Sequence, residues 1–241
     1  MPVIRSIVFL LATLSLPPAS LAGVDDPYPA FTAHYSVRIG GMESGRTMLS
    51  LSRVGEHEYL YRQTSKATGV AALFSSDSAE QSSRWRYSGG GIRPLEFRSR
   101  RAKGDDDDNA HLFFDWRSLR VENRGAGDHW RIAMPEGTLD SLSMQLAMVL
   151  GLREGRDSLS LPVAVRGRIK TYRFEKTGEE PVELAGGSYH AIRMARTDDK
   201  EDKSWFWFAP ALDYMLVRFV KKKKNGLTTE MLLQDVRFEA R

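Results

Sequence analysis

Apolar and polar residues alternate along most of this chain with a period of two, which is typical of half-buried β-strands. The pattern is clear in residues 31–39, where every second residue from Phe31 to Ile39 is apolar and the residues between them are polar. Gly40-Gly41 then predicts a turn. Further strands are predicted at residues 45–54, 58–67, 76–87, 92–101, 109–116, 119–124, 129–133, 158–165, 168–176, 189–197, 203–209, 214–222 and 229–238.

Residues 138–150, TLDSLSMQLAMVL, have helical spacing instead. Thr138 or Asp140 can accept from the first free N–H groups of a helix here, and Gly151 can take the position just after its end. We expect its apolar stripe to pack on the sheet, and the alternative is a plug or lid over a cavity. The stripe consists of Leu139, Leu142, Leu146, Val149 and Leu150.

The connections between the predicted strands are short, which favours hairpins and antiparallel pairing. The predicted fold is therefore mainly β. It is an antiparallel meander that forms a curved sheet, an incomplete barrel or two packed half-barrels, with one helix near residues 138–150. No repeat of fixed period is visible, and residues 23–241 are expected to form a single β-rich domain.

Residues 1–22 have the order of a secretory signal peptide: a basic residue, an apolar run over residues 7–16 and a small-x-small motif at 20–22. We expect cleavage after Ala22. The apolar run is shorter than the roughly 20 residues that a membrane-spanning helix needs. No later run reaches that length, so no transmembrane segment is expected after cleavage. The chain has no cysteine, and the expected location is the periplasm, with secretion as the alternative.

The net charge is +4, and loss of Arg5 with the signal peptide would lower it to +3. The sequence pI of about 9.3 therefore reflects only a small excess of basic residues. Such an excess permits an anionic partner without requiring one. A nucleic-acid role would need a contiguous basic face, and export argues against it, so no nucleic-acid partner is expected.

The sequence lacks the motifs of common enzyme classes, including HExxH, CxxC, GxSxG, SxxK, Walker loops and GxGxxG. Its five histidines are far apart and lack metal-ligand spacing. The acidic run at residues 105–108 fails as a calcium loop because Ala110 and Trp116 stand where glycine and glutamate are needed. We predict no catalytic residue, no metal and no cofactor, although a site assembled across strands would leave no local signature.

Residues 204–220, SWFWFAPALDYMLVRFV, predict two strands around a turn at 209–213. In the first strand, tryptophans point to one face and phenylalanines to the other. A sheet covered on one side does not need aromatics on both faces, so one face is a candidate for ligand contact. The alternative is that all of them build the core. The predicted ligand-contacting residues are Trp205, Phe206, Trp207, Phe208, Tyr214, Leu142 and Leu146.

Four lysines follow this segment and precede the turn signal Asn225-Gly226. They are ordinary residues for a solvated hairpin tip, where they discourage aggregation through strand edges. The alternative is electrostatic contact with anionic lipid head groups. The candidates for that contact are Lys221, Lys222, Lys223 and Lys224.

Several segments, taken in order, resemble one family of exported bacterial proteins, the domain of unknown function DUF3108. Residues 31–45 (FTAHYSVRIGGMESG) are similar to its opening strand and turn, and residues 91–97 (GIRPLEF) to its second signature. Residues 139–143 (LDSLS) resemble the start of its helix, and residues 205–219 its closing signature. Leu216 stands where the family favours proline. The resemblance implies an exported, β-rich fold and brings no activity or catalytic residues.

By architecture alone, the predicted fold is analogous to the lipid-carrying half-barrels of the bacterial envelope. The leading hypothesis is a non-enzymatic periplasmic protein that binds a lipid-like or apolar ligand on the concave face of its sheet. The second is an envelope assembly or scaffold protein that contacts other envelope proteins through strand edges and charged tips. The third is a hydrolase with a dispersed site.

Overall fold

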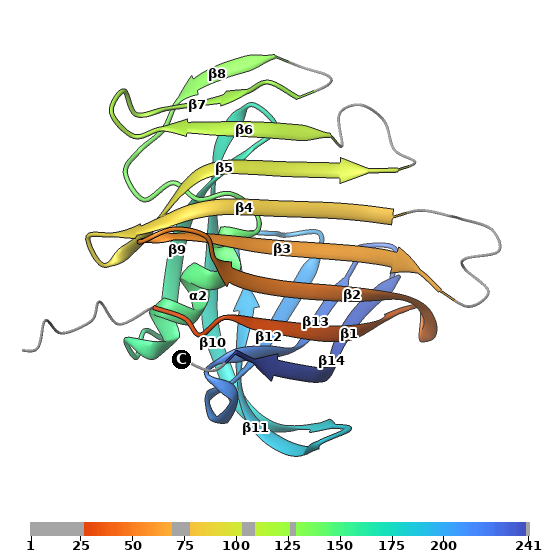
Figure 1. Ribbon diagram of the computed structural model, residues 1–241. Coiled ribbons are helices and arrows are strands. Elements are labelled where there is room, and N and C mark those ends of the chain that lie inside the picture. Colours follow the sequence, from red (N-terminus) through yellow and green to blue (C-terminus); the bar gives the residue numbers. More distant parts are fainter. Residues whose placement is uncertain (1–26, 69–77, 103–108, 126–128, 240–241) are drawn as a thin grey trace, which may run out of the picture.

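The computed structural model describes residues 27–68, 78–102, 109–125 and 129–239. These residues form one antiparallel sheet and one α-helix, α2 (Ser143–Arg153), as Figure 1 shows. The strands before α2 are β1 (Phe31–Ile39), β2 (Met42–Arg53), β3 (Glu58–Ala67), β4 (Ser78–Ser88), β5 (Gly91–Arg101), β6 (Ala110–Asp115), β7 (Arg120–Asn123) and β8 (Trp130–Ala133). Those after it are β9 (Ser158–Val165), β10 (Arg168–Leu184), β11 (Gly187–Arg196), β12 (Lys203–Ala209), β13 (Met215–Lys222) and β14 (Thr228–Phe238), with a short 3-10 turn at Pro210–Leu212.

The sheet is continuous, with the order β8-β7-β6-β5-β4-β3-β2-β1-β14-β13-β12-β11-β10-β9. The strands before the helix and those after it form two wings, which meet where β1 pairs with β14 from Phe31↔Phe238 to Ile39↔Thr229. The mainly β, antiparallel fold predicted from the sequence is confirmed. Of the predicted forms, the structure adopts a single curved sheet that stays open.

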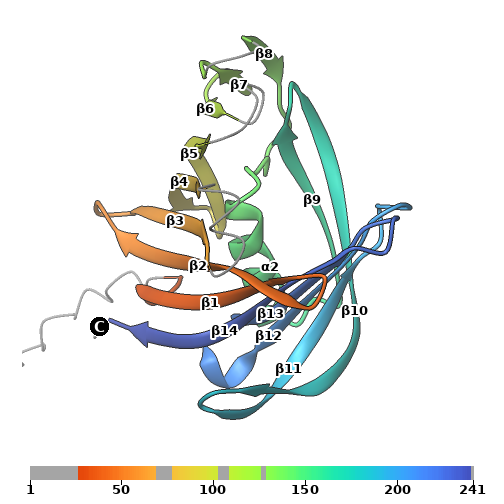
Figure 2. The same ribbon diagram turned by 90° about the vertical axis from the view of Figure 1, so that its right-hand side faces the viewer.

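The sheet curls around α2, so that its inner face surrounds the helix (Figure 2). The two terminal strands, β8 and β9, do not pair, but the ring of Trp130 on β8 packs against Gly167 in the turn after β9. The free edge of β9 is partly covered by the chain leading into α2. Leu139 N donates to Pro162 O at 2.8 Å, and Ala164 N donates to Leu139 O at 2.9 Å.

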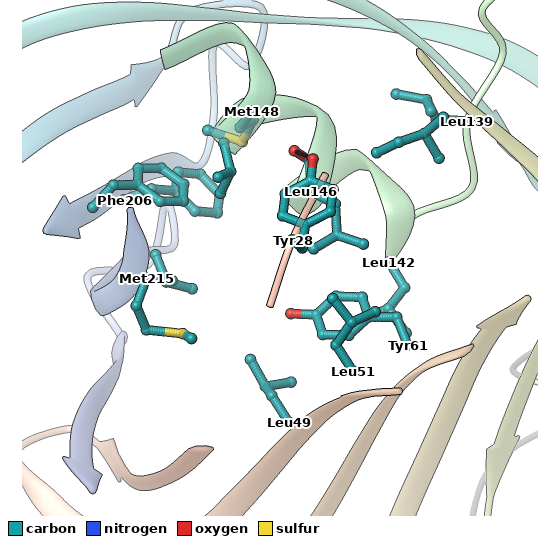
Figure 3. Close-up of a cluster of buried hydrophobic side chains, with 14 of the residues drawn as sticks. Tyr28, Leu49, Leu51, Tyr61, Leu139, Leu142, Leu146, Met148, Phe206 and Met215 are labelled. Carbon is teal, nitrogen blue, oxygen red and sulfur yellow. Dashed lines mark hydrogen bonds between the residues drawn. The ribbon is translucent and has the colours of Figure 1, made fainter. Parts of the chain in front are cut away.

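The hydrophobic core lies between α2 and the inner face of both wings (Figure 3). Alternate side chains are buried over residues 31–35 of β1, 45–51 of β2 and 59–61 of β3, which is the alternation seen in the sequence. Toward the ends of β1 and β3 the same face becomes half-buried or exposed. Trp85 on β4 is fully buried and stacks on Tyr59, with ring centroids 4.4 Å apart. The helix therefore serves as the second layer that a one-sided sheet needs.

The helix begins and ends later than predicted. It starts at Ser143 instead of residue 138, because Leu139 is used in the bridge to β9 and Asp140 caps the helix. Asp140 Oδ1 accepts from the backbone N–H groups of Leu142 and Ser143 at 2.8 and 2.7 Å. The cap is thus in place where one was expected, but the chain before it is extended.

Gly151 was predicted to follow the helix end, and this is wrong. Gly151 lies inside α2, where an added Cβ would come within 2.5 Å of Leu159 Cδ2. A larger residue here would force the Leu159 side chain to shift, so glycine allows close packing of the helix on β9. The positive φ of 72° that ends the helix belongs to Gly155.

Strand β10 extends eight residues beyond its predicted end and reaches Leu184. Its additional stretch contains Gly178 and Pro181, which read as a loop in the sequence. Proline is tolerated there because β9 pairs with β10 only up to Glu175, so this part of β10 is an edge. Gly178 lies at the irregularity in the pairing with β11.

Two expectations fall on residues outside the described ranges: the signal peptide at residues 1–22 and the acidic run at residues 105–108. Within the described ranges, α2 is too short to cross a membrane, and no helix there qualifies as a span.

Candidate functional site

An apolar pocket lies between α2 and the sheet, at one end of the curl. Its free space, mouth included, totals about 430 Å³, of which about 30 Å³ is wide enough for a water molecule. The interior is therefore nearly filled as it stands. The lining residues are Tyr28, Pro29, Phe31, Leu49, Tyr61, Gln145, Leu146, Val149, Arg153, Phe208, Asp213, Tyr214, Met215, Leu216 and Phe238.

Arg153, the last residue of α2, is the one basic side chain among the described residues of the lining. Its Nη2 donates to Asp213 Oδ1 at 2.9 Å and to Asp213 O at 3.1 Å, and its Nη1 donates to Pro27 O. Its guanidinium carbon also lies 5.2 Å from the ring centroid of Tyr28 and 6.0 Å from that of Tyr214. Arg153 thus ties together the helix end, the segment before β1 and the turn before β13.

The turn before β13 carries backbone strain. Asp213 and Tyr214 both have left-handed backbones, with φ of 58° and 59°. Such a conformation costs a non-glycine residue about 1 kcal/mol or more. Because Arg153 holds the carboxylate and carbonyl of Asp213, this strained turn depends on the ion pair at the mouth of the pocket.

Tyr28, in the segment before β1, places its side chain in the pocket. Its ring stands edge-on to Trp85, with centroids 5.8 Å apart, and its hydroxyl donates to Leu146 O on the helix (Figure 3). Burial raises the pKa of Tyr28 well above its ordinary value, despite the opposing effect of Arg153. The phenol therefore remains neutral and acts as a hydrogen-bond donor to the helix backbone.

Three of the seven predicted ligand-contacting residues line this pocket: Leu146 on the helix, Phe208 at the end of β12 and Tyr214 in the turn. Two more, Leu142 and Phe206, are buried in the core around α2 without lining it. Phe206 packs edge-on against Phe174, with ring centroids 5.6 Å apart. Ligand contact stays a prediction for the three lining residues, and the other two have a packing role.

Trp205 and Trp207 lie on the opposite, outer face of the sheet, as their alternation with the phenylalanines predicted. Trp207 is only 5% exposed, because Arg218 lies over its ring at 4.9 Å and its Nε1 donates to Glu180 Oε1 at 2.6 Å. These two tryptophans therefore do not contribute to the pocket.

The four lysines surround the hairpin between β13 and β14, and two of them are paired with carboxylates. Lys221 Nζ lies 2.8 Å from Asp202 Oδ2, and Lys224 Nζ lies 3.0 Å from Glu201 Oε1. The hydrogen bond from Lys221 lowers the pKa of the Asp202 carboxyl, and the smaller effect of burial, which would raise this pKa, does not reverse the shift. Lys222 and Lys223 keep most of the charge available to an anionic surface.

Within the described residues, no three His, Asp or Glu side chains form a group that could hold a metal ion. Three of the histidines are each bonded to a single carboxylate: His34 to Asp235, His111 to Glu96 and His190 to Glu179. The first and third of these pairs are largely exposed.

Sequence reasoning missed Tyr28, Arg153 and Asp213. Tyr28 stands in a Pro-Tyr-Pro stretch that reads as a linker, and Arg153 reads as an ordinary basic residue at a helix end. The contacts of Arg153 with Asp213 and Pro27 span 60 and 126 positions of sequence, and the contact of Tyr28 with Leu146 spans 118. A local pattern carries no signal for such contacts.

The fold and pocket define an open, curled antiparallel sheet whose concave face is filled by one helix, with an apolar pocket at one end. The chain belongs to the family described as protein of unknown function (DUF3108), whose model matches residues 31–232. This confirms the resemblance seen in the sequence. No curated protein matches the chain.

Among solved structures, the chain is similar to a β-barrel-like protein of the domain of unknown function DUF1849 from Brucella abortus. The TM-score is 0.56 at 9% identity, covering 88% of this chain and 99% of that one. A protein from Parabacteroides distasonis described as a lipoprotein has a TM-score of 0.37 at 9% identity, with coverage of 88% and 96%. A domain from Vibrio parahaemolyticus described as outer membrane lipoprotein-sorting has 0.27 at 10%, with coverage of 88% and 86%. The first similarity supports the fold, and the other two scores are too low to bear on it.

Proposed function

We propose that this protein is a non-enzymatic protein of the bacterial periplasm that binds an apolar chain, such as the acyl chain of a lipid, between α2 and the sheet. The observation that carries the proposal is the apolar pocket with Arg153 at its mouth. Small-molecule sites are typically apolar hollows with a few placed polar groups. An acyl chain would contact Leu146 and Phe208, and its polar head would meet the guanidinium.

The pocket has to widen to accept such a chain, since only about 30 Å³ is free for a water-sized body. Two elements are placed to move. Tyr28 is held to the helix by one hydrogen bond, and the strained turn at Asp213 is held by Arg153. A ligand with an anionic head would take the place of the Asp213 carboxylate on Arg153, which would release the turn. The entering chain would displace Tyr28 separately, by breaking its hydrogen bond to Leu146 O.

The test uses the full chain exported to a bacterial periplasm, purified without detergent and examined by native mass spectrometry and lipid extraction. A fluorescent fatty acid then measures affinity. Replacing Tyr28 by alanine should enlarge the pocket and tighten probe binding about tenfold, equivalent to about 1.4 kcal/mol. Tyr189→Ala is the matched control, because Tyr189 lies on β11 outside the pocket.

A second variant keeps the test decisive if the first is poorly folded. Val149→Phe adds volume at the pocket wall and should abolish probe binding while the circular dichroism spectrum is kept. Protein that carries no lipid, together with probe binding that is absent from the wild type and from Tyr28→Ala, would overturn the proposal.

The second candidate function is that of an envelope assembly or scaffold protein. The observation that favours it is the nearly filled interior, because a filled core leaves the outer surface as the place of action. Cross-linking in cells followed by purification should then capture a defined envelope partner. Capture should be lost in the double variant Lys222→Glu, Lys223→Glu. If capture persists in this variant, the lysines do not form the contact with the partner.

A further inference from the structure

The outer face of the sheet has a broad polar hollow over β3 to β6. These strands are labelled in Figure 1. The space in the hollow that is wide enough for a water molecule is about 620 Å³, against about 30 Å³ in the apolar pocket. Among the residues that the structure describes, four arginines and two glutamates line it, together with one histidine. These charged residues are Arg62, Arg84, Arg98, Arg100, Glu80, Glu96 and His111.

One of the two glutamates is already occupied by cations. Glu96 Oε1 lies 2.7 Å from Arg98 and 2.6 Å from His111, and Glu96 Oε2 lies 3.8 Å from Arg84. Partial burial raises the pKa of Glu96, but the hydrogen bonds from His111 and Arg98 outweigh this effect and lower it overall. Glu96 therefore stays ionised and holds its neighbours in place, with little capacity left to neutralise the rest of the hollow.

Two of the arginines have no such partner. Within the described part of the chain, the guanidinium groups of Arg62 and Arg100 form no ion pair or hydrogen bond, although both line the hollow and are exposed. Glu80 stands opposite Arg100 in the pairing of β4 with β5, but the two side chains form no ion pair. The hollow thus has unpaired positive charge directed into it.

The strand register sets these groups in a row across the sheet. Arg62 on β3 pairs with Ser82 on β4, which pairs with Arg98 on β5. Neighbouring strands lie about 4.8 Å apart, so the two arginine backbones are about 10 Å apart, with the serine hydroxyl between them. Side chains of this length can converge above the serine, and guanidinium forks bind phosphate oxygens in pairs.

We propose that this hollow binds a phosphate group near Ser82, held by the unpaired guanidinium groups of Arg62 and Arg100. Arg98, whose Nε and Nη2 are engaged by Glu96, adds only its remaining N–H groups from the side. The ligand chemistry is that of a phosphate monoester or phosphate diester, whether it comes from a lipid head group or from a soluble compound. This site is independent of the apolar pocket, since the sheet separates the two.

The experiment titrates the full chain with inorganic phosphate at low salt and follows backbone amide shifts by nuclear magnetic resonance. Saturable shifts are expected at Ser82 and Arg98. Replacing Arg62 by glutamine should weaken binding about tenfold through loss of charge-assisted hydrogen bonds. Arg168→Gln is the matched control, because Arg168 is an exposed arginine on β10 outside the hollow, and it should leave the affinity unchanged.

A second arm uses vesicles of phosphatidylcholine with and without phosphatidic acid. Binding that requires phosphatidic acid and is weakened by Arg62→Gln would identify a lipid head group as the source. Binding of free phosphate with no gain on vesicles would identify a soluble ligand. The proposal fails if neither probe binds saturably, or if Arg168→Gln weakens binding as much as Arg62→Gln does.

Discussion

The carboxyl group of Asp140 provides a direct test of how α2 is held inside the sheet. Asp140 is fully buried; its Oδ1 accepts from two backbone N–H groups at the helix start, and its Oδ2 accepts from Ser83 Oγ on β4 at 2.6 Å. One side chain thus caps the helix and joins it to the sheet. Replacing it by alanine leaves three buried donors without this acceptor.

Each buried donor left unsatisfied costs about 1–3 kcal/mol. The variant also avoids the cost of burying a carboxyl group in an apolar site, which offsets part of this loss. We therefore expect Asp140→Ala to lower the free energy of unfolding by about 2–4 kcal/mol. For a domain of this size, the melting temperature should fall by roughly 5–15 °C. Ser83→Ala, which removes one donor together with its bond, should cost about 1 kcal/mol.

Asp140→Asn separates the hydrogen bonds from the charge. The asparagine oxygen can still accept from both backbone N–H groups, so the loss at neutral pH should stay within about 1 kcal/mol. Burial raises the pKa of Asp140, and the hydrogen bonds from Ser83, Ser143 and Leu142 oppose this without reversing it. The folded state therefore binds the proton more tightly than the unfolded state, whose aspartate pKa is about 3.9.

The sign of the pH dependence follows from this linkage. The contribution of Asp140 is fully present below about pH 4 and declines as the pH rises through the raised pKa of the folded state. Asp140→Asn should not show this decline. Urea unfolding followed by circular dichroism from pH 3 to pH 8 measures both variants. The reasoning is refuted if Asp140→Asn destabilises as much as Asp140→Ala, or if its stability declines over the same pH range as that of the wild type.

Two further predictions concern packing and charge in the second wing. Gly151→Ala should lower the free energy of unfolding by about 1–2 kcal/mol, because overpacking against Leu159 outweighs the better helix propensity of alanine. In a Leu159→Ala background the same change should be neutral or stabilising, and additive effects in this double-mutant cycle would contradict the packing argument. Partial burial raises the pKa of Asp198, but the hydrogen bonds from Arg196, at 2.8 and 2.9 Å, lower it overall. Asp198→Asn should therefore cost about 1–3 kcal/mol at pH 7, with a difference that shrinks as the pH falls below about 4, and a difference independent of pH would contradict this.

The strands were predictable where local patterning decides the structure. Residues 31–39, 58–67, 158–165 and 203–209 were predicted with the bounds that the structure has, since alternation and flanking turn residues are local signals. The helix bounds were less predictable, because the bridge from Leu139 to Val163 competes with the first helical turn. The end of β10 was missed because its edge position, which makes Pro181 acceptable, depends on where β9 stops.

The pocket was predictable only in part, for the same reason. Leu146, Phe208 and Tyr214 were found because they are apolar residues in strongly patterned segments. Arg153 and Asp213 are far apart in the sequence and come into contact only in the folded protein. The positive φ of Asp213 could not be predicted, because the residue there is not a glycine. Contacts of this kind follow from the completed fold rather than from any one segment.

The aromatic run on β12 shows what alternation along a strand can and cannot say. Aromatics on both faces suggested that one face meets a ligand, yet Trp207 is buried on the outer face, where the polar side chains of Arg218 and Glu180 contact it. The guanidinium of Arg218 lies over the Trp207 ring, and the Glu180 carboxylate accepts a hydrogen bond from its indole N–H. An aromatic residue in a strand pattern therefore predicts that other side chains will shield it from solvent, but it does not predict which side chains these are. On the inner face the cover is α2, and of the four aromatics only Phe208 reaches the pocket.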